Sequence, residues 1–170
     1  MILGLLMLAA FVGLARSITA LLAQDHDSVS VDQRWQPARE GSVRDRHTNH
    51  WWTRCSIGQT PRAWLCEQQP RAMSQAEARR ACENLQLGAK KWRLPELNEL
   101  RQLIVILAPG QNALNQQVFA MSTRAEYWSR SPVRSALLPE DQSFYYVNFQ
   151  RGGVYAAAAA DKLFVRCISP

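Results

Sequence analysis

The stretch SQAEARRACENL, residues 74–85, and the stretch LFVRCI, residues 163–168, together decide the fold that the sequence predicts. Ser74 and Glu77 have the spacing of a capping box, and the alanine-rich residues after them favour a helix that continues to Leu85. Cys82 falls on the apolar face of this helix, and a terminal strand can bring Cys167 beside it. We therefore expect a disulfide between them, which closes a loop of about 85 residues and contributes about 4 to 5 kcal/mol.

A second pair of cysteines flanks a predicted hairpin. Residues 51–57 and 63–67 are short aromatic and β-branched runs, and the Gly-Gln-Thr-Pro sequence between them is typical of a turn. Cys55 and Cys66 fall on the two arms, so we expect a second, local disulfide. Paired cysteines persist in oxidising compartments, so this interpretation depends on where the chain is located.

Residues 1–23 are expected to be a signal peptide or a membrane anchor. They are almost entirely apolar, and Ala20 and Ala23 are small residues suited to cleavage. No basic residue precedes the apolar core, and Arg16 interrupts a run of about 22 residues, which is close to the length of a membrane-spanning helix. Both alternatives place the rest of the chain outside the cytoplasm, so we expect a periplasmic, cell-surface or secreted protein, anchored in the membrane if residues 1–23 are retained.

The remaining chain is long enough for one domain. Residues 24–50 are rich in polar and charged side chains and predict a polar arm or linker, with the folded domain at residues 51–170. His47 and His50 stand three residues apart in this arm. Nothing around them predicts a helix, so a solvated segment is favoured over a metal site.

The chain is basic, with a formal net charge of +6, and its positive charge is mostly arginine. The planar guanidinium group suits bidentate contacts to sulfate, phosphate or carboxylate. Ordinary surface solubility is the alternative explanation of the charge. Export argues against nucleic acid as a partner.

Several short motifs occur in a telling order. They are Trp52-Thr53-Arg54-Cys55, the helical Cys82, Trp92-Arg93-Leu94-Pro95 with Glu99-Leu100, Tyr127-Trp128-Ser129 and Val165-Arg166-Cys167. Together they resemble the C-terminal domain of Legionella collagen-like adhesins over residues 51–168, although Arg130 stands where family members often carry a serine. An isolated Arg-Leu-Pro is also similar to the formylglycine-generating enzyme family.

The resemblance implies an α+β, C-type-lectin-like fold with two disulfides, in which two helices flank a small, twisted, mostly antiparallel sheet. It also implies a disulfide that fastens the first helix to the last strand, in agreement with the placement of Cys82 and Cys167. The second helix is expected after Pro95, because Leu97, Leu100 and Leu103 recur at helical spacing.

Other segments predict loops and strands. Asn112, Asn115 and Phe119 lie in an expected loop, where asparagine favours turns. Residues 144–150 and 154–155 alternate as strands do, around a tight turn at Gly152-Gly153. The alanines at 156–160 are compatible with a helix, a loop or a strand.

No catalytic site is predicted. The four cysteines are assigned to disulfides and the three histidines to the arm, so we expect no catalytic residue, cofactor or metal. Glu96 and Glu99 are explained by their place at the start of a helix. Formylglycine-generating chemistry requires free cysteines. Calcium-dependent sugar binding through Glu140, Asp141 and Asn148 is less favoured than a polar turn.

The main hypothesis is a bacterial, adhesin-like binding module that recognises an anionic polysaccharide or a protein partner. Its resemblance to a glycosaminoglycan-binding adhesin domain supports this, and the candidate ligand residues are Arg124, Arg130, Arg134 and Arg151, all in predicted loops. The alternative is a structural or assembly subunit anchored by an uncleaved N-terminal helix, with exposed tryptophans at its contacts. Both hypotheses leave the oligomeric state open.

Overall fold

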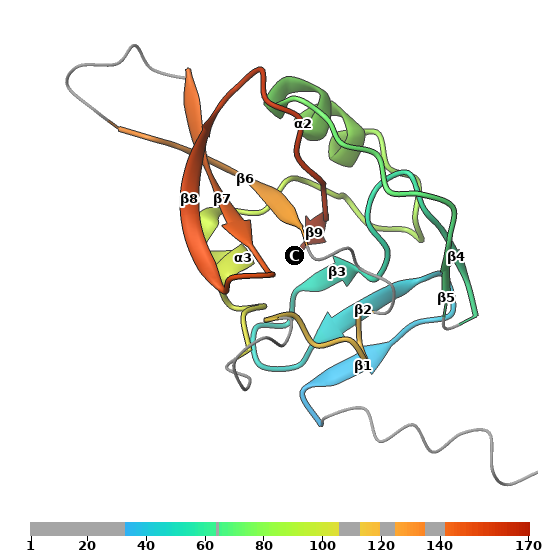
Figure 1. Ribbon diagram of the computed structural model, residues 1–170. Helices are drawn as coiled ribbons and strands as arrows, with labels where there is room; N and C mark the ends of the chain where they lie inside the picture. The colour runs from blue at the N-terminus through green and yellow to red at the C-terminus, as the bar shows by residue number, and fades with distance from the viewer. Residues whose placement is uncertain (1–32, 64, 106–112, 120–124, 135–141) are drawn as a thin grey trace, which may run out of the picture. The chain divides into compact units, whose positions relative to one another are not determined.

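Four short antiparallel strands join the beginning of the described chain to its end. The computed structural model describes residues 33–63, 65–105, 113–119, 125–134 and 142–170. The strands β1 (Trp35–Pro37), β2 (Ser42–Asp45), β3 (Trp51–Thr53) and β9 (Ile168–Ser169) form a sheet in the order β1-β2-β3-β9. The last strand therefore lies against β3, as Figure 1 shows.

The strands β1 and β2 differ from the predicted polar arm. Trp35 and Val43 are buried in the core, and Asp45 accepts hydrogen bonds from the Arg34 Nε and Nη2 at 3.0 and 2.7 Å. The Arg34 guanidinium and the His47 backbone N–H outweigh the opposing effect of burial and hold the pKa of Asp45 below its usual value. From Trp35 onward, the segment predicted as an arm is part of the sheet.

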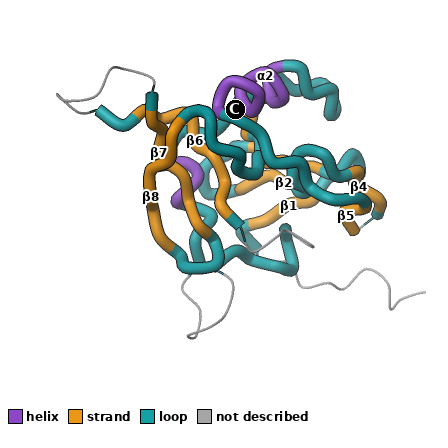
Figure 2. The backbone as a smooth tube through the Cα atoms, turned by 45° about the horizontal axis from the view of Figure 1, so that its top comes forward, coloured by secondary structure: helices purple, strands orange, loops and turns teal. Residues whose placement is uncertain are grey.

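A second sheet contains three longer antiparallel strands. It consists of β6 (Glu126–Pro132), β7 (Ser143–Asn148) and β8 (Gly153–Ala158) in the order β6-β7-β8. The tube view in Figure 2 shows these strands side by side. The predicted strands and tight turn are confirmed here, and the first three of the five alanines complete β8.

A small hairpin replaces the larger one that the sequence predicts. Its strands are β4 (Thr60–Arg62) and β5 (Leu65–Glu67), whereas Trp51 to Thr53 belong to the four-stranded sheet. Cys55 therefore lies between β3 and β4 and not on an arm of the hairpin. The hairpin packs closely on Gly41, where φ is +91° and an added Cβ would lie 2.4 Å from the Pro61 Cβ.

The two expected helices are present but short. The helix α2 (Gln75–Glu83) begins at a capping box, because the Ser74 side chain accepts from the N3 backbone and Glu77 accepts from the Ser74 N–H at 2.8 Å. The helix α3 (Leu97–Arg101) begins with a similar box. It ends early because Ile104 leaves the helical path to form a β-bridge with Leu114.

The predicted fold class is wrong. The described residues form mostly β structure, in three antiparallel sheets, with helices of nine and five residues that do not flank one sheet. The prediction overestimated α3, whose leucine spacing continues past the point where the helix ends. It also missed β1 and β2, which are too short to show alternation. Among the described residues, no helix has the length and apolar character needed to cross a membrane.

Two hydrophobic clusters form the core, and β6 contributes to both. Successive side chains of a strand point to opposite faces, so Tyr127 enters one cluster and Trp128 the other. Tyr127 packs edge to face on Phe149, and Trp128 on Phe144, with ring centroids 5.5 and 6.5 Å apart. The expected core positions of Trp92 and Trp128 are confirmed.

Both predicted disulfides are confirmed. Cys82 on α2 pairs with Cys167, which precedes β9, across 85 residues of sequence, and both cysteines are fully buried. Cys55 pairs with Cys66 on β5 across 11 residues. The first bond links α2 to the end of the chain, and the second links the small hairpin to the segment after β3.

Candidate functional site

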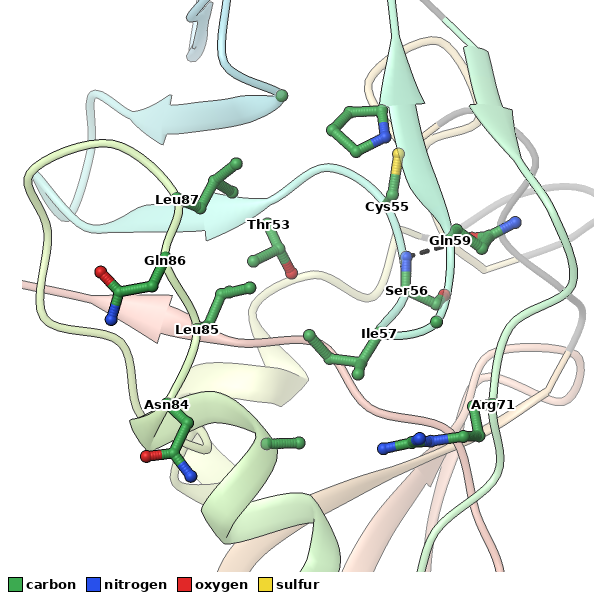
Figure 3. Close-up of a pocket in the computed structure, with 14 residues that line it drawn as sticks. Thr53, Cys55, Ser56, Ile57, Gln59, Arg71, Asn84, Leu85, Gln86 and Leu87 are labelled. Atoms are coloured by element: carbon green, nitrogen blue, oxygen red, sulfur yellow. Dashed lines mark hydrogen bonds between the residues drawn. The ribbon is translucent and has the colours of Figure 1, made fainter.

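One pocket lies next to the C-terminal end of α2. Its volume is about 390 Å³. The segment after β3 forms one wall, with Ile57, and the residues at the end of α2 and after it form the other, with Ala81 and Leu85. Figure 3 shows both walls and the Arg71 side chain, which extends from a third segment toward the helix. The pocket thus combines apolar walls with one cation.

The backbone of Arg71 is held against the segment after β3. Its N–H donates to the Ile57 carbonyl at 2.9 Å. Gly58 makes this approach close, because its φ is +97° and an added Cβ would lie 2.7 Å from the Arg71 nitrogen. The fold therefore fixes the point from which the guanidinium enters the pocket. Asn84 and Gln86 add amide groups at the opposite wall.

A second pocket lies beside the N-terminal end of α2. Its volume is about 330 Å³, and its lining includes Gln75, Arg79, Arg80 and Phe144. Gln75 is buried and donates through Nε2 to the Ser129 carbonyl. Its Oε1 is also buried, with no hydrogen-bond partner in the described part of the chain. This pocket therefore has two cations beside a buried glutamine.

Arg71, Arg79 and Arg80 together are called the α2 face. All three are exposed, and none forms an ion pair with another described residue. Six described carboxylates form ion pairs with other cations, whereas Glu83 at the end of α2 is exposed and forms none, so it offsets part of the charge of Arg79 and Arg80. On α2 itself, Lys162 and Ser74 hydrogen-bond Glu77 and lower its pKa to about 2. The remaining positive charge of the α2 face is therefore available to an external anion.

Comparison of the sequence with known protein families identifies the family of this chain. Residues 41–169 match the model of the Lcl C-terminal domain. The chain belongs to the Lcl C-terminal domain family. No curated protein and no solved structure matches the chain significantly. Family membership and the two disulfides identify a disulfide-stabilised, adhesin-like module, as the sequence motifs predicted.

The candidate arginines of the second half that the structure describes do not form one site in this Lcl C-terminal domain. Arg134 follows the end of β6 where Pro132 pairs with Phe144, whereas Arg151 follows Asn148 at the opposite end of the sheet. Arg130 is half exposed and its Nε lies 2.9 Å from the Glu96 Oε1. Arg124 lies outside the described residues. We infer no shared pocket for these side chains.

Arg151 contributes to a smaller polar pocket. Lys162 and Glu126 also line it, so a carboxylate offsets part of its positive charge. Asn148 is one of the possible calcium ligands named from the sequence. Its Oδ1 accepts the backbone N–H groups of Gln150 and Arg151 at 2.9 and 3.0 Å and shapes the turn before β8. Glu140 and Asp141 lie outside the described residues. No group of potential metal ligands occurs within the described part.

The other polar residues singled out from the sequence have structural partners. Glu99 forms a bidentate pair with Arg93 at 2.6 and 2.8 Å, and Glu96 accepts from the Ser131 hydroxyl at 2.7 Å. Asn115 accepts from the Gln117 N–H at 3.0 Å, as expected of a turn asparagine, whereas Asn112 lies outside the described residues. All four cysteines are in disulfides, so the domain offers no thiol nucleophile.

Sequence reasoning missed the α2 face. The sequence pattern places Arg79 and Arg80 on the solvent side of an amphipathic helix, and both side chains are indeed exposed. Their position beside a pocket depends on Phe144 and Ala159, which are far away in the sequence. The available signal was the local density of arginine, since three arginines occur within ten residues of sequence and no lysine accompanies them.

Proposed function

We propose that this domain is an exported, non-catalytic binding module that recognises an anionic polysaccharide through the α2 face. The observation that carries the proposal is the grouping of three exposed arginines around one short helix, with a pocket on either side of it. None of these arginines forms an ion pair with a described carboxylate. A polymer that carries several negative charges can contact Arg71 at one pocket and Arg79 and Arg80 at the other.

The chemistry of the two pockets fits a sugar acid or a sulfated sugar. Guanidinium groups bind carboxylate and sulfate through paired hydrogen bonds. The exposed Arg79 and Arg80 line the second pocket beside Phe144, so a sugar acid there could meet both cations and an aromatic wall. Apolar walls at Ile57 and Leu85 suit the carbon faces of a sugar ring. Charge supplies the attraction, and the pockets supply selectivity.

Export is part of the proposal. Two disulfides in a domain of this size favour an oxidising compartment, namely the periplasm, the cell surface or the external medium. Residues 1–23 would deliver the chain as a signal peptide or hold it as an anchor. Non-reducing peptide mass spectrometry of protein from its native host reports both the mature N-terminus and the cysteine pairing. An intact N-terminus with reduced cysteines would contradict export.

Heparin chromatography tests the ligand class. The triple variant Arg71→Glu, Arg79→Glu, Arg80→Glu removes the α2 face. The matched control reverses three other exposed arginines that form no ion pair with a described residue, Arg39, Arg46 and Arg101. Both triple variants change the net charge equally, so a difference between them reports position and not total charge.

We expect the α2-face variant to lose retention on heparin and the control to keep most of it, with a salt dependence close to that of the wild type. Retention on a column of neutral dextran should be absent for all three proteins. Equal losses in the two triple variants would reduce the interaction to net charge and overturn the assignment of the α2 face. Reversal of Arg124, Arg130, Arg134 and Arg151 tests the other arginine set in the same assay.

A further inference from the structure

The two edges of the three-stranded sheet differ in their hydrogen bonding. The outer edge of β6 is covered, because the Trp128 N–H donates to the Phe164 carbonyl at 3.0 Å and the Phe164 N–H donates to the Glu126 carbonyl at 2.9 Å. The outer edge of β8 has no partner strand among the described residues. Figure 1 shows β8 at the border of the fold.

The direction of the backbone groups of β8 follows from the bonds at its end. The Ala159 N–H donates to the Gln142 carbonyl at 2.8 Å, toward the β7 side. The Ala158 N–H donates to the Asp161 Oδ2 and its carbonyl accepts the Asp161 N–H, both at 2.9 Å, so the Ala158 groups point away from β7. Backbone groups alternate along a strand. Val154 and Ala156 therefore also point their N–H and C=O groups outward.

The register on β7 agrees with this direction. Ser143 and Tyr145 lie opposite Ala158 and Ala156. The Ser143 carbonyl accepts from the Val133 N–H at 2.9 Å, and the Tyr145 carbonyl accepts from the Ser129 hydroxyl at 2.7 Å, so both point toward β6. Val154 and Ala156 thus present four backbone hydrogen-bonding groups at an open edge.

The edge of β8 lacks the features that usually prevent strand pairing. Natural edge strands carry lysine, proline or a bulge, or are covered by another segment. The strand GVYAAA has no charge and no proline, and it pairs with β7 in unbroken register. Val154 and Tyr155 are 36% and 39% exposed. The edge is therefore regular, apolar and accessible.

We propose that β8 pairs antiparallel with β8 of a second copy of this chain, centred on Tyr155. In this register Val154 of each copy faces Ala156 of the other, and each of these two pairs exchanges two backbone hydrogen bonds. The two three-stranded sheets become one six-stranded sheet about a twofold axis. The contact is isologous and therefore closes as a dimer.

The side chains favour a second copy over an unrelated strand. Valine opposite alanine avoids crowding, and the two Tyr155 rings face each other. Each Tyr155 already stacks on its own Tyr146, with ring centroids 5.6 Å apart and an interplanar angle of 28°. The dimer therefore continues an existing aromatic row from two rings to four.

Charge complementarity favours the antiparallel direction. Arg151 precedes β8 and Asp161 follows it, so the ends of the segment carry opposite charges. Antiparallel pairing brings Arg151 of each copy toward Asp161 of the other. Parallel pairing would instead place like charges beside each other at both ends. This proposal does not depend on the polysaccharide ligand.

Cross-linking of the full-length chain tests the register. Facing residues of a non-hydrogen-bonded antiparallel pair have Cα atoms about 4.5 Å apart, which is within disulfide range. We expect Tyr155→Cys to form a covalent dimer under mild oxidation. The matched control Ala160→Cys adds an exposed thiol just outside the strand, far from its counterpart in the dimer, and should stay monomeric on non-reducing gels.

Sedimentation of the full-length chain tests the unlinked dimer. Ala156→Pro removes an outward N–H without removing a bond to β7, and edge strands tolerate proline. We expect the wild type to dimerise and Ala156→Pro to raise the dimer dissociation constant at least about tenfold at an unchanged unfolding midpoint. A wild type that stays monomeric at about 100 μM, or equal cross-linking of the Tyr155→Cys and Ala160→Cys variants, would overturn the proposal.

Discussion

The two disulfides should differ in their contributions to the free energy of unfolding, because they close loops of very different length. Cys82 and Cys167 are separated by 85 residues, and Cys55 and Cys66 by 11. In the chain-entropy model the long loop contributes about 4.5 kcal/mol and the short loop about 3 kcal/mol. Replacing each pair with alanines should therefore cost about 1.5 kcal/mol more for the long loop.

Packing acts in the same direction. Cys82 and Cys167 are 0% exposed within the second hydrophobic cluster, whereas Cys55 and Cys66 are 5% and 6% exposed. Loss of the buried sulfur atoms therefore adds to the cost of removing the long-loop disulfide. The total difference between the two double-alanine variants should exceed about 1.5 kcal/mol.

Guanidinium unfolding followed by tryptophan fluorescence measures this difference, with both double variants and the wild type in one buffer. The transitions must be two-state for the comparison to hold, and the m-values report this. Equal losses in the two variants, or a larger loss without Cys55–Cys66, would refute the reasoning. Either result would mean that the disulfide between α2 and the end of the chain is not the main constraint on the unfolded state.

Three further predictions follow from individual side chains. Lys162→Met should raise the Glu77 pKa from about 2 toward its ordinary value of 4.5, because Lys162 is the largest cause of the depression; carboxyl NMR titration measures it. In the wild type the depressed pKa stabilises the fold above pH 4.5, and this contribution is lost as the pH falls through about 2. Arg166→Leu should lower the free energy of unfolding by about 3 kcal/mol, because the buried Nη1 donates to the Thr53 and Arg54 carbonyls. The exposed control Arg79→Leu should change the free energy of unfolding by less than about 0.5 kcal/mol in the same denaturation assay. Gly41→Ala should cost at least about 1 kcal/mol in thermal unfolding, because its φ is +91° and the new Cβ would meet Pro61; an unchanged midpoint would contradict this packing.

Local sequence was sufficient for the features that local bonds determine. The Ser74 and Glu77 spacing predicts the start of α2, and the helical period from there places Cys82 on the buried face. The position of Cys167 in an apolar terminal stretch then makes it the partner. The first two steps depend on residues within a few positions of each other, whereas the pairing of Cys82 with Cys167 spans 85 residues and follows from the apolar character of both sites.

The sheets were harder to predict because pairing between distant residues determines them. The strands β1, β3 and β9 have only two or three residues, which is too short for alternation to show. Trp35 and Val43 are single apolar residues among polar ones, so their segment resembled a linker. Both are buried in the first hydrophobic cluster with residues far away in the sequence, and Trp35 packs on the ring of Phe119.

The candidate binding surface depends on the same long-range contacts. Arg134 and Arg151 were both placed in predicted loops, but the register of β6 on β7 puts them at opposite ends of one sheet. Arg71 is brought to α2 by a hydrogen bond to Ile57, and neither residue carries a sequence signal for that contact. The sequence made arginines the candidate ligand residues, and the fold determines which arginines lie beside a pocket.

The most direct test of the central claim is an NMR titration of the isotopically labelled full-length chain with a short heparin oligosaccharide. The α2 face should define the contact, and Gln75 lines the pocket beside Arg79 and Arg80. We predict that the largest shift changes occur at Arg71, Arg79, Arg80 and the Gln75 side-chain amide, and that they weaken with added salt. Changes centred on Arg134 or Arg151, or no changes at all, would contradict recognition of an anionic polysaccharide by the α2 face.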